Sequence, residues 1–270
     1  MLAALDRLVS ARRLHETVFI GHLEAAPTRS IADLGDALRL RRAAGTDVPA
    51  AGRFTAAGRF EPHGEHLLVR ERDTRRPVAT CRLVTPREAR RAGGLPIEQG
   101  FVIDGLEPLR ARLVDVGRVC LDPERPAGPA MLALWSALAR YLGARRLTHA
   151  VGVVELSAQD GGHHAASLHR SLMRGRCDAA VRPRRPVPPG PMPERCDPTL
   201  PAAVRGYLRA GARVAGAPHL DEATGRAWLP MLLELDREPT HGLQRFGTAW
   251  SGAALQTEPG ARTALAGNGP

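Results

Sequence analysis

The fold is decided by residues 113–157, which read LVDVGRVCLDPERPAGPAMLALWSALARYLGARRLTHAVGVVELS. The apolar run Leu113–Leu121 predicts a strand, and an Arg/Pro/Gly-rich turn follows at Arg125–Ala130. Apolar residues at helical spacing then predict an amphipathic helix: Met131, Leu134, Trp135, Leu138 and Leu142. Pro129 suits the first helical turn, where its missing N–H costs nothing, and Gly143 is expected to be the C-cap. Because a helix N-terminus offers free N–H groups and a positive dipole end, the segment predicts a site for an anionic group.

Composition permits several partners without identifying one. The chain has 270 residues, enough for one large domain or two small ones. Its net charge is +10, and every one of the 38 basic residues is arginine. Aromatic residues make up only 4%, too few for a platform on which single-stranded nucleic acid could stack. We therefore expect no nucleic-acid partner, although a basic surface suits acidic proteins and anionic membranes in general.

The cysteines and the apolar runs narrow the class of protein further. Cys81, Cys120, Cys177 and Cys196 form no CxxC pair, so neither a zinc ribbon nor a redox motif is indicated. No apolar run is long enough to span a bilayer, and charges interrupt the N-terminal segment where a signal peptide would be apolar. A cytoplasmic protein is expected, with the surface of the membrane as the alternative location.

A pass along the chain predicts strands and helices in mixed order. Strands are expected at Val18–Leu23, His66–Arg70, Val78–Val84 and Trp228–Leu235, and helices at Ile31–Arg42 (capped by Ser30), 163–175 and Leu200–Ala210. Loops or irregular segments are expected at Ala43–Gly58, Arg87–Gly100 and the Pro/Arg-rich stretch 181–198. This order implies an α/β or α+β three-layer domain at 18–250, preceded by an extension at 1–17 (with a short helix in 1–16) and followed by a flexible tail at 251–270.

Charged residues on the predicted strand 113–121 are candidates for a substrate-binding or catalytic site. Asp115 and Arg118 are three residues apart, so on a regular strand they face opposite sides of the sheet. A bulge near Gly117 would bring both to one site, and Arg82 at the end of the preceding strand could join them. A carboxylate beside a guanidinium is expected to stay ionised and to orient an amine or a carboxylate. A purely structural ion pair is the alternative.

Upstream, Glu61, Glu65 and His66 precede a buried strand. Any of the three could accept a proton from an attacking amine, although a solvated loop position is the better interpretation for Glu65. His63 and His66 have no further ligands at a recognisable spacing, so no metal site is expected.

Ordered motifs add a resemblance to a known family. The turn Arg125–Ala130 fits Arg-x-x-Gly-x-Ala and resembles the acyl-donor loop of GNAT acyltransferases. The succession FEPHGEHLLV (60–69), ATCRLVTP (79–86), LVDVGRVCLDPERP (113–126) and LWSALARYL (134–142) is similar to the ornithine-lipid acyltransferases (L-ornithine Nα-acyltransferases). These GNAT-like enzymes are related in fold to the acyl-homoserine-lactone synthases. The segment Leu200–Ala212 matches their Leu-Pro…Gly-Tyr-Leu-Arg-x-Gly-Ala motif, so the resemblance covers 18–247.

The resemblance implies a GNAT-like three-layer fold with a mixed central sheet, and an N-acyltransferase activity. The family moves a fatty acyl group, commonly 3-hydroxylated, from acyl carrier protein to the α-amine of ornithine, which yields a lyso-ornithine lipid. No bound cofactor is implied, because the phosphopantetheine thioester of acyl carrier protein, or acyl-CoA, is a co-substrate. The residues expected to bind the acyl donor are Val119, Cys120, Arg125, Gly128, Pro129 and Ala130, of which Val119 or Cys120 would offer a backbone N–H to the thioester oxygen.

For the acceptor, the resemblance implies that Glu61 or His66 takes the proton of the amine. It also implies that Arg82, Asp115 and Arg118 orient the acceptor. The chain departs from the family at Gly58, where an acid is usual, and in 38–43, where the usual aromatics are missing. Cys120 is expected to be a packed side chain rather than a nucleophile. Three other interpretations stay open: an acyl-homoserine-lactone-synthase-like enzyme, an acetyl-CoA-dependent GNAT acetyltransferase, and a basic nucleic-acid-binding protein.

Overall fold

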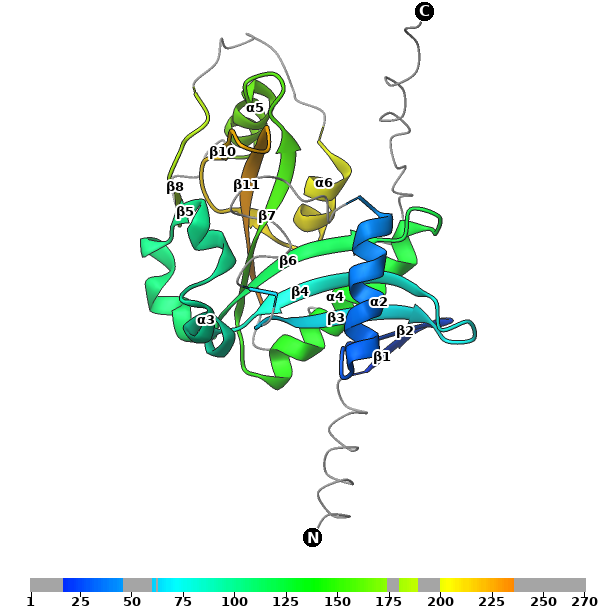
Figure 1. Cartoon of the computed structure of the whole chain (residues 1–270). Coiled ribbons are helices and arrows are strands. Elements are labelled where there is room, and N and C mark those ends of the chain that lie inside the picture. The colour runs from blue at the N-terminus through cyan, green and yellow to red at the C-terminus, as the bar shows by residue number, and fades with distance from the viewer. Residues whose placement is uncertain (1–16, 46–59, 62, 174–179, 189–199, 236–270) are drawn as a thin grey trace, which may run out of the picture.

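A computed structural model describes residues 17–45, 60–61, 63–173, 180–188 and 200–235 (Figure 1). One large sheet runs through it in the order β1-β2-β3-β4-β6-β7-β11-β10, with β9 paired to β11. β6 and β7 are parallel, and the other neighbours are antiparallel. The strands are β1 Val18–Ile20, β2 Leu23–Pro27, β3 Glu65–Glu71, β4 Pro77–Val84, β6 Leu113–Leu121, β7 His149–Ser157, β9 Arg213–Val214, β10 His219–Asp221 and β11 Arg226–Glu234. A separate pair joins β5 Phe101–Val102 to β8 Arg182–Pro183.

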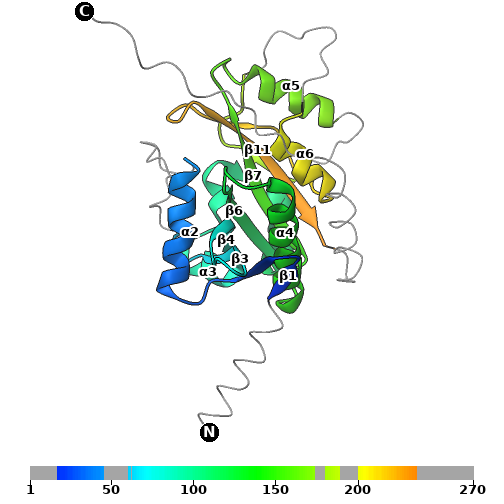
Figure 2. The ribbon, with the colours of Figure 1, turned by 90° about the vertical axis from the view of Figure 1, so that its right-hand side faces the viewer.

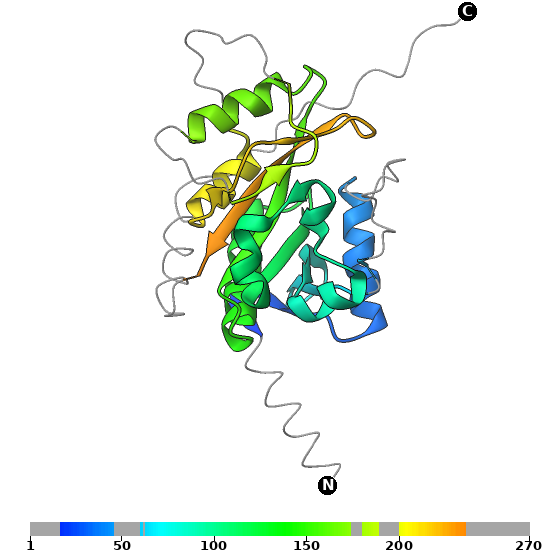
Figure 3. The same ribbon diagram turned by 90° about the vertical axis from the view of Figure 1, so that its left-hand side faces the viewer.

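Helices cover both faces of this sheet, which confirms the expected three layers. The helices are α2 Ile31–Ala43, α3 Pro86–Ala92, α4 Ala127–Ala144, α5 His163–Leu172 and α6 Ala202–Arg209, with 3-10 turns η1 Pro96–Gln99 and η2 Asp104–Arg112. Figure 2 shows α2 and α4 on opposite sides of β3, β4 and β6. The segment from α3 to η2 lies on the side of the sheet away from α4, as Figure 3 shows.

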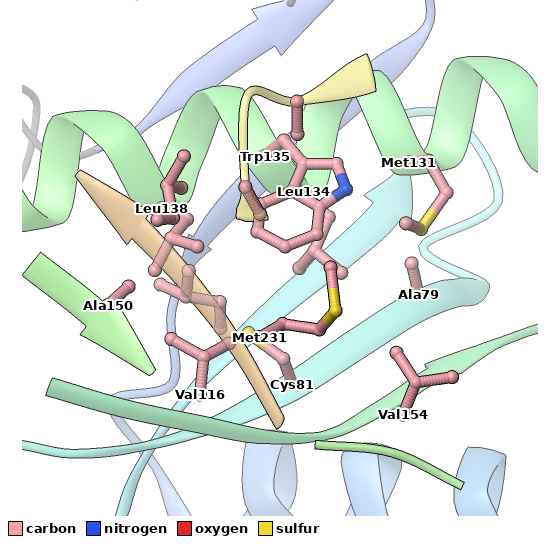
Figure 4. Close-up of a cluster of buried hydrophobic side chains, with 14 of the residues drawn as sticks. Ala79, Cys81, Val116, Met131, Leu134, Trp135, Leu138, Ala150, Val154 and Met231 are labelled. Atoms are coloured by element: carbon pink, nitrogen blue, oxygen red, sulfur yellow. The ribbon is translucent and has the colours of Figure 1, made fainter. Parts of the chain in front are cut away.

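Two hydrophobic cores result, one on each face of the sheet. Side chains of β7 alternate between the two cores, as expected of a strand: Ala150 and Val154 lie in the core under α4, and Val151 lies in the other core. Under α4, Trp135 and its neighbours pack against residues of β4, β6 and β11 (Figure 4). The sheet is therefore buried on both faces at its centre, and polar groups there need partners within the protein.

β6 and β7 separate after a short parallel ladder. Only three residue pairs join the two strands, from Leu113–His149 to Asp115–Val151, although each strand continues for six more residues. A Cβ atom built on Gly152 would lie 2.4 Å from the Val116 carbonyl oxygen, so the strands still touch at the point where they begin to separate. Beyond it, no strand among the described residues pairs with the β7-facing edge of β6.

Several predicted elements are confirmed. Ser30 caps α2 through a capping box with Asp33, whose backbone N–H donates to the Ser30 hydroxyl at 3.0 Å. The hairpin of β3 and β4, the strand Leu113–Leu121 and the final strand all form. Pro129 lies in the first turn of α4, as expected.

Other predictions were wrong in detail. The strand expected at Val18–Leu23 is a hairpin, because Gly21 turns the chain with a φ of 57°. The expected irregular excursion Arg87–Gly100 contains α3 and η1. Helix α4 begins at Ala127, inside the expected turn, and continues through Gly143 to a C-cap at Arg145.

Within the stretch 181–198, residues 181–188 are described and contribute β8, so this part is not irregular throughout. The predicted helix in 1–16, most of the loop Ala43–Gly58 and the tail 251–270 lie outside the described residues. Among the helices that are described, none is both long and apolar enough to cross a membrane.

Candidate functional site

Helix α2 carries a fully buried arginine, Arg41, on the side that packs against the sheet. Ala37, Leu40 and Arg41 form the buried stripe of α2 at the i, i+3, i+4 spacing of a helix. Arg41 is 0% exposed, although it occupies the position of an apolar residue in this stripe. A buried guanidinium stays charged and must be paired, so the contacts of Arg41 define a polar site inside the protein.

Arg41 contacts both Glu61 and His66. Its Nη1 donates to Glu61 Oε2 at 3.1 Å and Oε1 at 3.3 Å, and its Nη2 lies 2.8 Å from His66 Nδ1. Burial alone would raise the pKa of Glu61, but Arg41 and then Arg82 and His66 outweigh it and lower that pKa. Glu61 is therefore held as a carboxylate.

Arg82 extends this cluster across the sheet. On the face covered by α2, His66, Arg82 and Gly117 are successive cross-strand neighbours on β3, β4 and β6. Arg82 Nη1 donates to Glu61 Oε1 at 2.9 Å, and the guanidinium lies over the Phe60 ring at 5.7 Å. Glu61 thus accepts hydrogen bonds from two arginines, one on a helix and one on a strand.

The bulge expected near Gly117 is present. Thr80 pairs with Cys120 and Arg82 pairs with Gly117, so β6 has one residue more than β4 over this interval. Arg118 sits in the interval with a φ of 54°, a left-handed conformation that costs energy for a residue with a side chain. Burial first, and then the nearby charge of Arg82, lower the pKa of Arg118, with opposing contributions from Glu155 and Glu61. The bulge therefore brings Arg118 close enough for its charge to interact with those of Arg82 and Glu61.

Asp115 lies two residues before Gly117 on the same face of β6. It is 3% exposed, and its Oδ2 accepts a hydrogen bond from the Ile97 N–H of η1 at 2.8 Å. Burial raises the pKa of Asp115 from 3.8 to about 6, and the charge of Arg82 only partly opposes this. We expected the neighbouring guanidinium to keep Asp115 ionised; Arg82 does lower the pKa of Asp115, but burial has the larger effect and raises it.

Gly117 leaves space between these groups. A Cβ on Gly117 would lie 3.6 Å from both Arg82 Nη2 and Asp115 Oδ1. The space beside Gly117 is therefore bordered by the guanidinium of Arg82 and the carboxyl group of Asp115. It lies next to the edge of β6 that pairs with no described strand.

The predicted donor residues lie further along β6 and at the start of α4. Ala127 and Gly128 occupy the first two positions of α4, where N–H groups have no intrahelical acceptor. Among the described residues, no side chain caps this terminus and a Cβ on Gly128 would meet nothing within 4 Å; the first turn holds no acidic residue. Pro126, the N-cap residue, and Pro129 have no N–H to offer. Arg125 forms an ion pair with Glu71 at 2.9 Å, with its side chain 40% exposed.

Cys120 is buried, and its Sγ lies 3.7 Å from the Leu40 carbonyl oxygen of α2. This packing agrees with the expectation of an apolar-type cysteine. Val119 is partly buried against the core under α4. Glu65, for which a solvated position was preferred, faces the other way and lies 3.5 Å from Arg145 at the end of α4.

A small, partly open apolar cavity lies where β6 and β7 separate. Val116, Gly152, Trp135, Tyr207 and Met231 are among its lining residues. The Tyr207 ring packs edge-on against Trp135, with ring centroids 5.2 Å apart. This cavity lies on the α4 side, so the sheet opening has a charged cluster on one face and an apolar space on the other.

The structure thus gathers Glu61, His66, Arg82, Asp115 and Arg118 into one region, while Gly58 lies outside the described residues. Sequence reasoning missed Arg41. Its signal was an arginine on the apolar stripe of an amphipathic helix, where a charged residue needs a buried partner. Within the described residues, no group of three or more His, Cys, Asp or Glu side chains is arranged to hold a metal ion.

Comparison with known proteins identifies a known domain in this chain. Residues 42–136 match the family model of the acetyltransferase (GNAT) domain. The L-ornithine N(alpha)-acyltransferase of Rhodobacter capsulatus is 35% identical over 112 residues, which cover 38% of this chain and 42% of that protein. The protein of the same name from Brucella abortus is 26% identical over 212 residues, covering 71% of this chain and 74% of the relative.

Solved structures resemble the chain only distantly. The AHL synthase LasI is 13% identical, with 88% of this chain and 98% of that chain covered and a TM-score of 0.45. An N-acetyltransferase from Staphylococcus aureus Mu50 is 11% identical, with 78% and 99% covered and a TM-score of 0.42. The chain contains a GNAT acetyltransferase domain at residues 42–136, and it is an acyltransferase similar to the L-ornithine N(alpha)-acyltransferases.

Proposed function

We propose that this protein transfers a fatty acyl group from a thioester donor to the α-amine of ornithine or a similar amino acid. The observation that carries the proposal is the buried cluster beside the opening of the sheet. It contains three arginines (Arg41, Arg82 and Arg118) and two carboxyl groups (Glu61 and Asp115). A site with both signs of charge and an excess of guanidinium complements an amino acid, which carries an ammonium and a carboxylate.

The donor half is supported by the strand edge and the helix N-terminus. A phosphate of the donor pantetheine would lie at the first turn of α4, where the Ala127 and Gly128 N–H groups point outward and negative charge is favoured. The thioester would lie along β6, with its oxygen at the N–H of Val119 or Cys120. A preorganised donor of this kind contributes roughly 3–4 kcal/mol in enzymes from which one has been removed. The start of the acyl chain would lie against the apolar residues at Gly152, where the small cavity would have to widen to admit it.

In the proposed acceptor site, the two carboxyl groups have different roles. Glu61, kept anionic by two arginines, pairs with the incoming ammonium, and Arg82 or Arg118 pairs with the acceptor carboxylate. Asp115, with a pKa of about 6, is the better proton acceptor, because a base works best when its pKa is near the working pH. The amine nitrogen then forms a bond to the thioester carbon, the carbon–sulfur bond breaks, and the departing thiolate takes the second proton of the amine nitrogen, so that the donor leaves as a thiol.

Acyl carrier protein is the donor that we favour over CoA, because an acidic carrier suits a chain with a net charge of +10. The product would be a lyso-ornithine-type lipid, formed at the cytoplasmic face of the inner membrane.

The test is to incubate the purified protein with 3-hydroxyacyl carrier protein or the matching acyl-CoA, together with a panel of amino acids. Tandem mass spectrometry then identifies the product and the acylated nitrogen. The proposal predicts an Nα-acyl product with ornithine or a close analogue, and faster transfer from the carrier protein. Absence of an acylated product with every amine and both donors would refute it.

A further inference from the structure

The contact between Arg41 and His66 fixes where the proton of the imidazole lies. A guanidinium has only N–H groups to offer and no lone pair that accepts. Because Arg41 Nη2 lies 2.8 Å from His66 Nδ1, that nitrogen must be the acceptor. A neutral imidazole with an acceptor at Nδ1 carries its hydrogen at Nε2.

This Nε2–H is buried and has no hydrogen-bond partner within the part of the chain that the structure describes. His66 is 2% exposed, so water does not compensate freely for the missing partner. Glu61 Oε2 lies 3.7 Å from His66 Nε2, just beyond hydrogen-bond distance. The Nε2–H is thus an unused donor 3.7 Å from the carboxylate of the proposed acceptor site, and a small movement of that carboxylate would give it a partner.

We propose that Arg41 and His66 are positioning residues for the acceptor amine: Arg41 holds His66 as its Nε2–H tautomer, and this N–H bonds to Glu61 when the ammonium of the acceptor binds. The inference rests on the proposed function and deepens it. Once the ammonium attracts Glu61, the carboxylate needs a movement of less than an ångström to accept the His66 hydrogen bond. The two positioning residues then fix the carboxylate in the orientation that presents the amine to the thioester.

The charge state of the imidazole agrees with this role. Burial, and next the charge of Arg41, lower the pKa of His66 to about 4, although Glu61 opposes them. His66 is therefore neutral at physiological pH, as the tautomer requires. Because Nδ1 is occupied and Nε2 carries a hydrogen, His66 has no lone pair left with which to take a proton from the amine. Asp115 remains free for that step.

The first test needs no substrate. Long-range nitrogen–proton NMR spectra of the ¹⁵N-histidine-labelled protein distinguish a nitrogen with a hydrogen from one with a lone pair. The chain has ten histidines, and the signal of His66 is identified by its loss in His66→Asn and His66→Gln. The proposal predicts a lone-pair shift at Nδ1 and an N–H shift at Nε2 at neutral pH. The opposite pattern would overturn it whatever the enzyme does.

The second test separates the two contacts of the imidazole kinetically. The amide oxygen of Asn can replace the acceptor at Nδ1, and the amide nitrogen of Gln can replace the donor at Nε2. His66→Asn therefore keeps the Arg41 bond but loses the bond to Glu61. We expect it to raise the KM for the acceptor by roughly tenfold to a hundredfold, the effect of a hydrogen bond to a charged group. His66→Gln is expected to raise it less, and neither is expected to change the KM for the acyl donor.

Arg41→Met is compared with Arg39→Met, the same substitution at an exposed position of the same helix, where Arg39 pairs with Asp36 on the surface. We expect Arg41→Met to raise the acceptor KM and Arg39→Met to change neither KM. Guanidinium added to the Arg41→Met protein is expected to restore part of the loss. Equal changes in the acceptor and donor KM values of Arg41→Met would show a merely structural role and overturn the proposal. A wild-type protein that forms no product would instead refute the proposed function, and the NMR test would still decide the tautomer.

Discussion

Gly152 lies against the Val116 carbonyl at the point where β6 and β7 separate, and we expect this close approach to be needed for the geometry of the site. In Gly152→Ala the added methyl would lie 2.4 Å from that oxygen, whereas real Cβ contacts essentially never fall below 3.0 Å. Both partners are backbone atoms in buried strands, so no side chain can rotate away to relieve the overlap. One of the two strands must move, at the point from which the donor site opens.

Such overpacking costs about 1–3 kcal/mol of unfolding free energy. For a domain of this size each kcal/mol lowers the Tm by roughly 2–4 °C, so we expect a fall of about 2–12 °C. Acyl transfer should suffer more, because a displacement near 1 Å at the reacting groups can cost about a hundredfold in rate. Strand β6 carries the N–H groups proposed to bind the thioester oxygen, so the loss should appear in kcat/KM.

The measurement combines urea unfolding with acyl-transfer kinetics of the same preparation. Gly128→Ala is the matched control, because a Cβ at Gly128 meets nothing within 4 Å. This control should keep the wild-type unfolding midpoint and activity. If Gly152→Ala retained both the midpoint and kcat/KM of the wild type, the strand contact would not control the site, and the reasoning would be refuted.

Three further predictions concern charge and capping. For Asp115→Asn we expect the free energy of unfolding, relative to that of the wild type, to be about 2–3 kcal/mol higher at pH 7 than at pH 4, measured by urea unfolding. The reason is that the raised pKa of about 6 stabilises the folded wild type fully below pH 3.8, and this stabilisation is lost as the pH rises through 6. An equal stability difference at both pH values would contradict the burial argument. Gly128→Asp should keep the fold, because a carboxylate is favourable at a helix N-terminus. It should raise the KM for the acyl donor at least tenfold, because the carboxylate repels the donor phosphate. A donor KM equal to that of Gly128→Ala would contradict this prediction. Ser30→Ala should lower the unfolding free energy by about 0.5–2 kcal/mol through loss of the α2 cap, measured by urea unfolding, and an unchanged midpoint would show that the capping box contributes nothing.

The sequence predicted those features that depend on local patterns. The apolar run at Leu113–Leu121, the cap at Ser30 and the proline in the first turn of α4 are each set by neighbouring residues. The bulge could also be predicted, because Gly117 separates two charges that a regular strand would place on opposite faces. The order of motifs along the chain then indicated the family.

The rest depends on contacts between distant segments. Arg41 joins Glu61 and His66 only after α2 packs across β3 and β4, and no local pattern shows which charged residues will meet. η1 was missed within the expected excursion Arg87–Gly100, although it supplies the N–H that holds Asp115. The pKa of Asp115 likewise depends on burial by η1 and the sheet, which the sequence around it does not reveal.

The central claim is that the buried cluster of three arginines and two carboxyl groups recognises both charged groups of an amino-acid acceptor. Ornithine and putrescine test it most directly, because putrescine is ornithine without the carboxylate. With the same acyl donor, we predict that kcat/KM is about 10- to 150-fold higher for ornithine, the effect of one charge-assisted contact to a carboxylate of roughly 1.5–3 kcal/mol. We also predict that Arg82→Gln removes most of this preference. Equal kcat/KM values for the two amines in the wild-type protein would contradict the account.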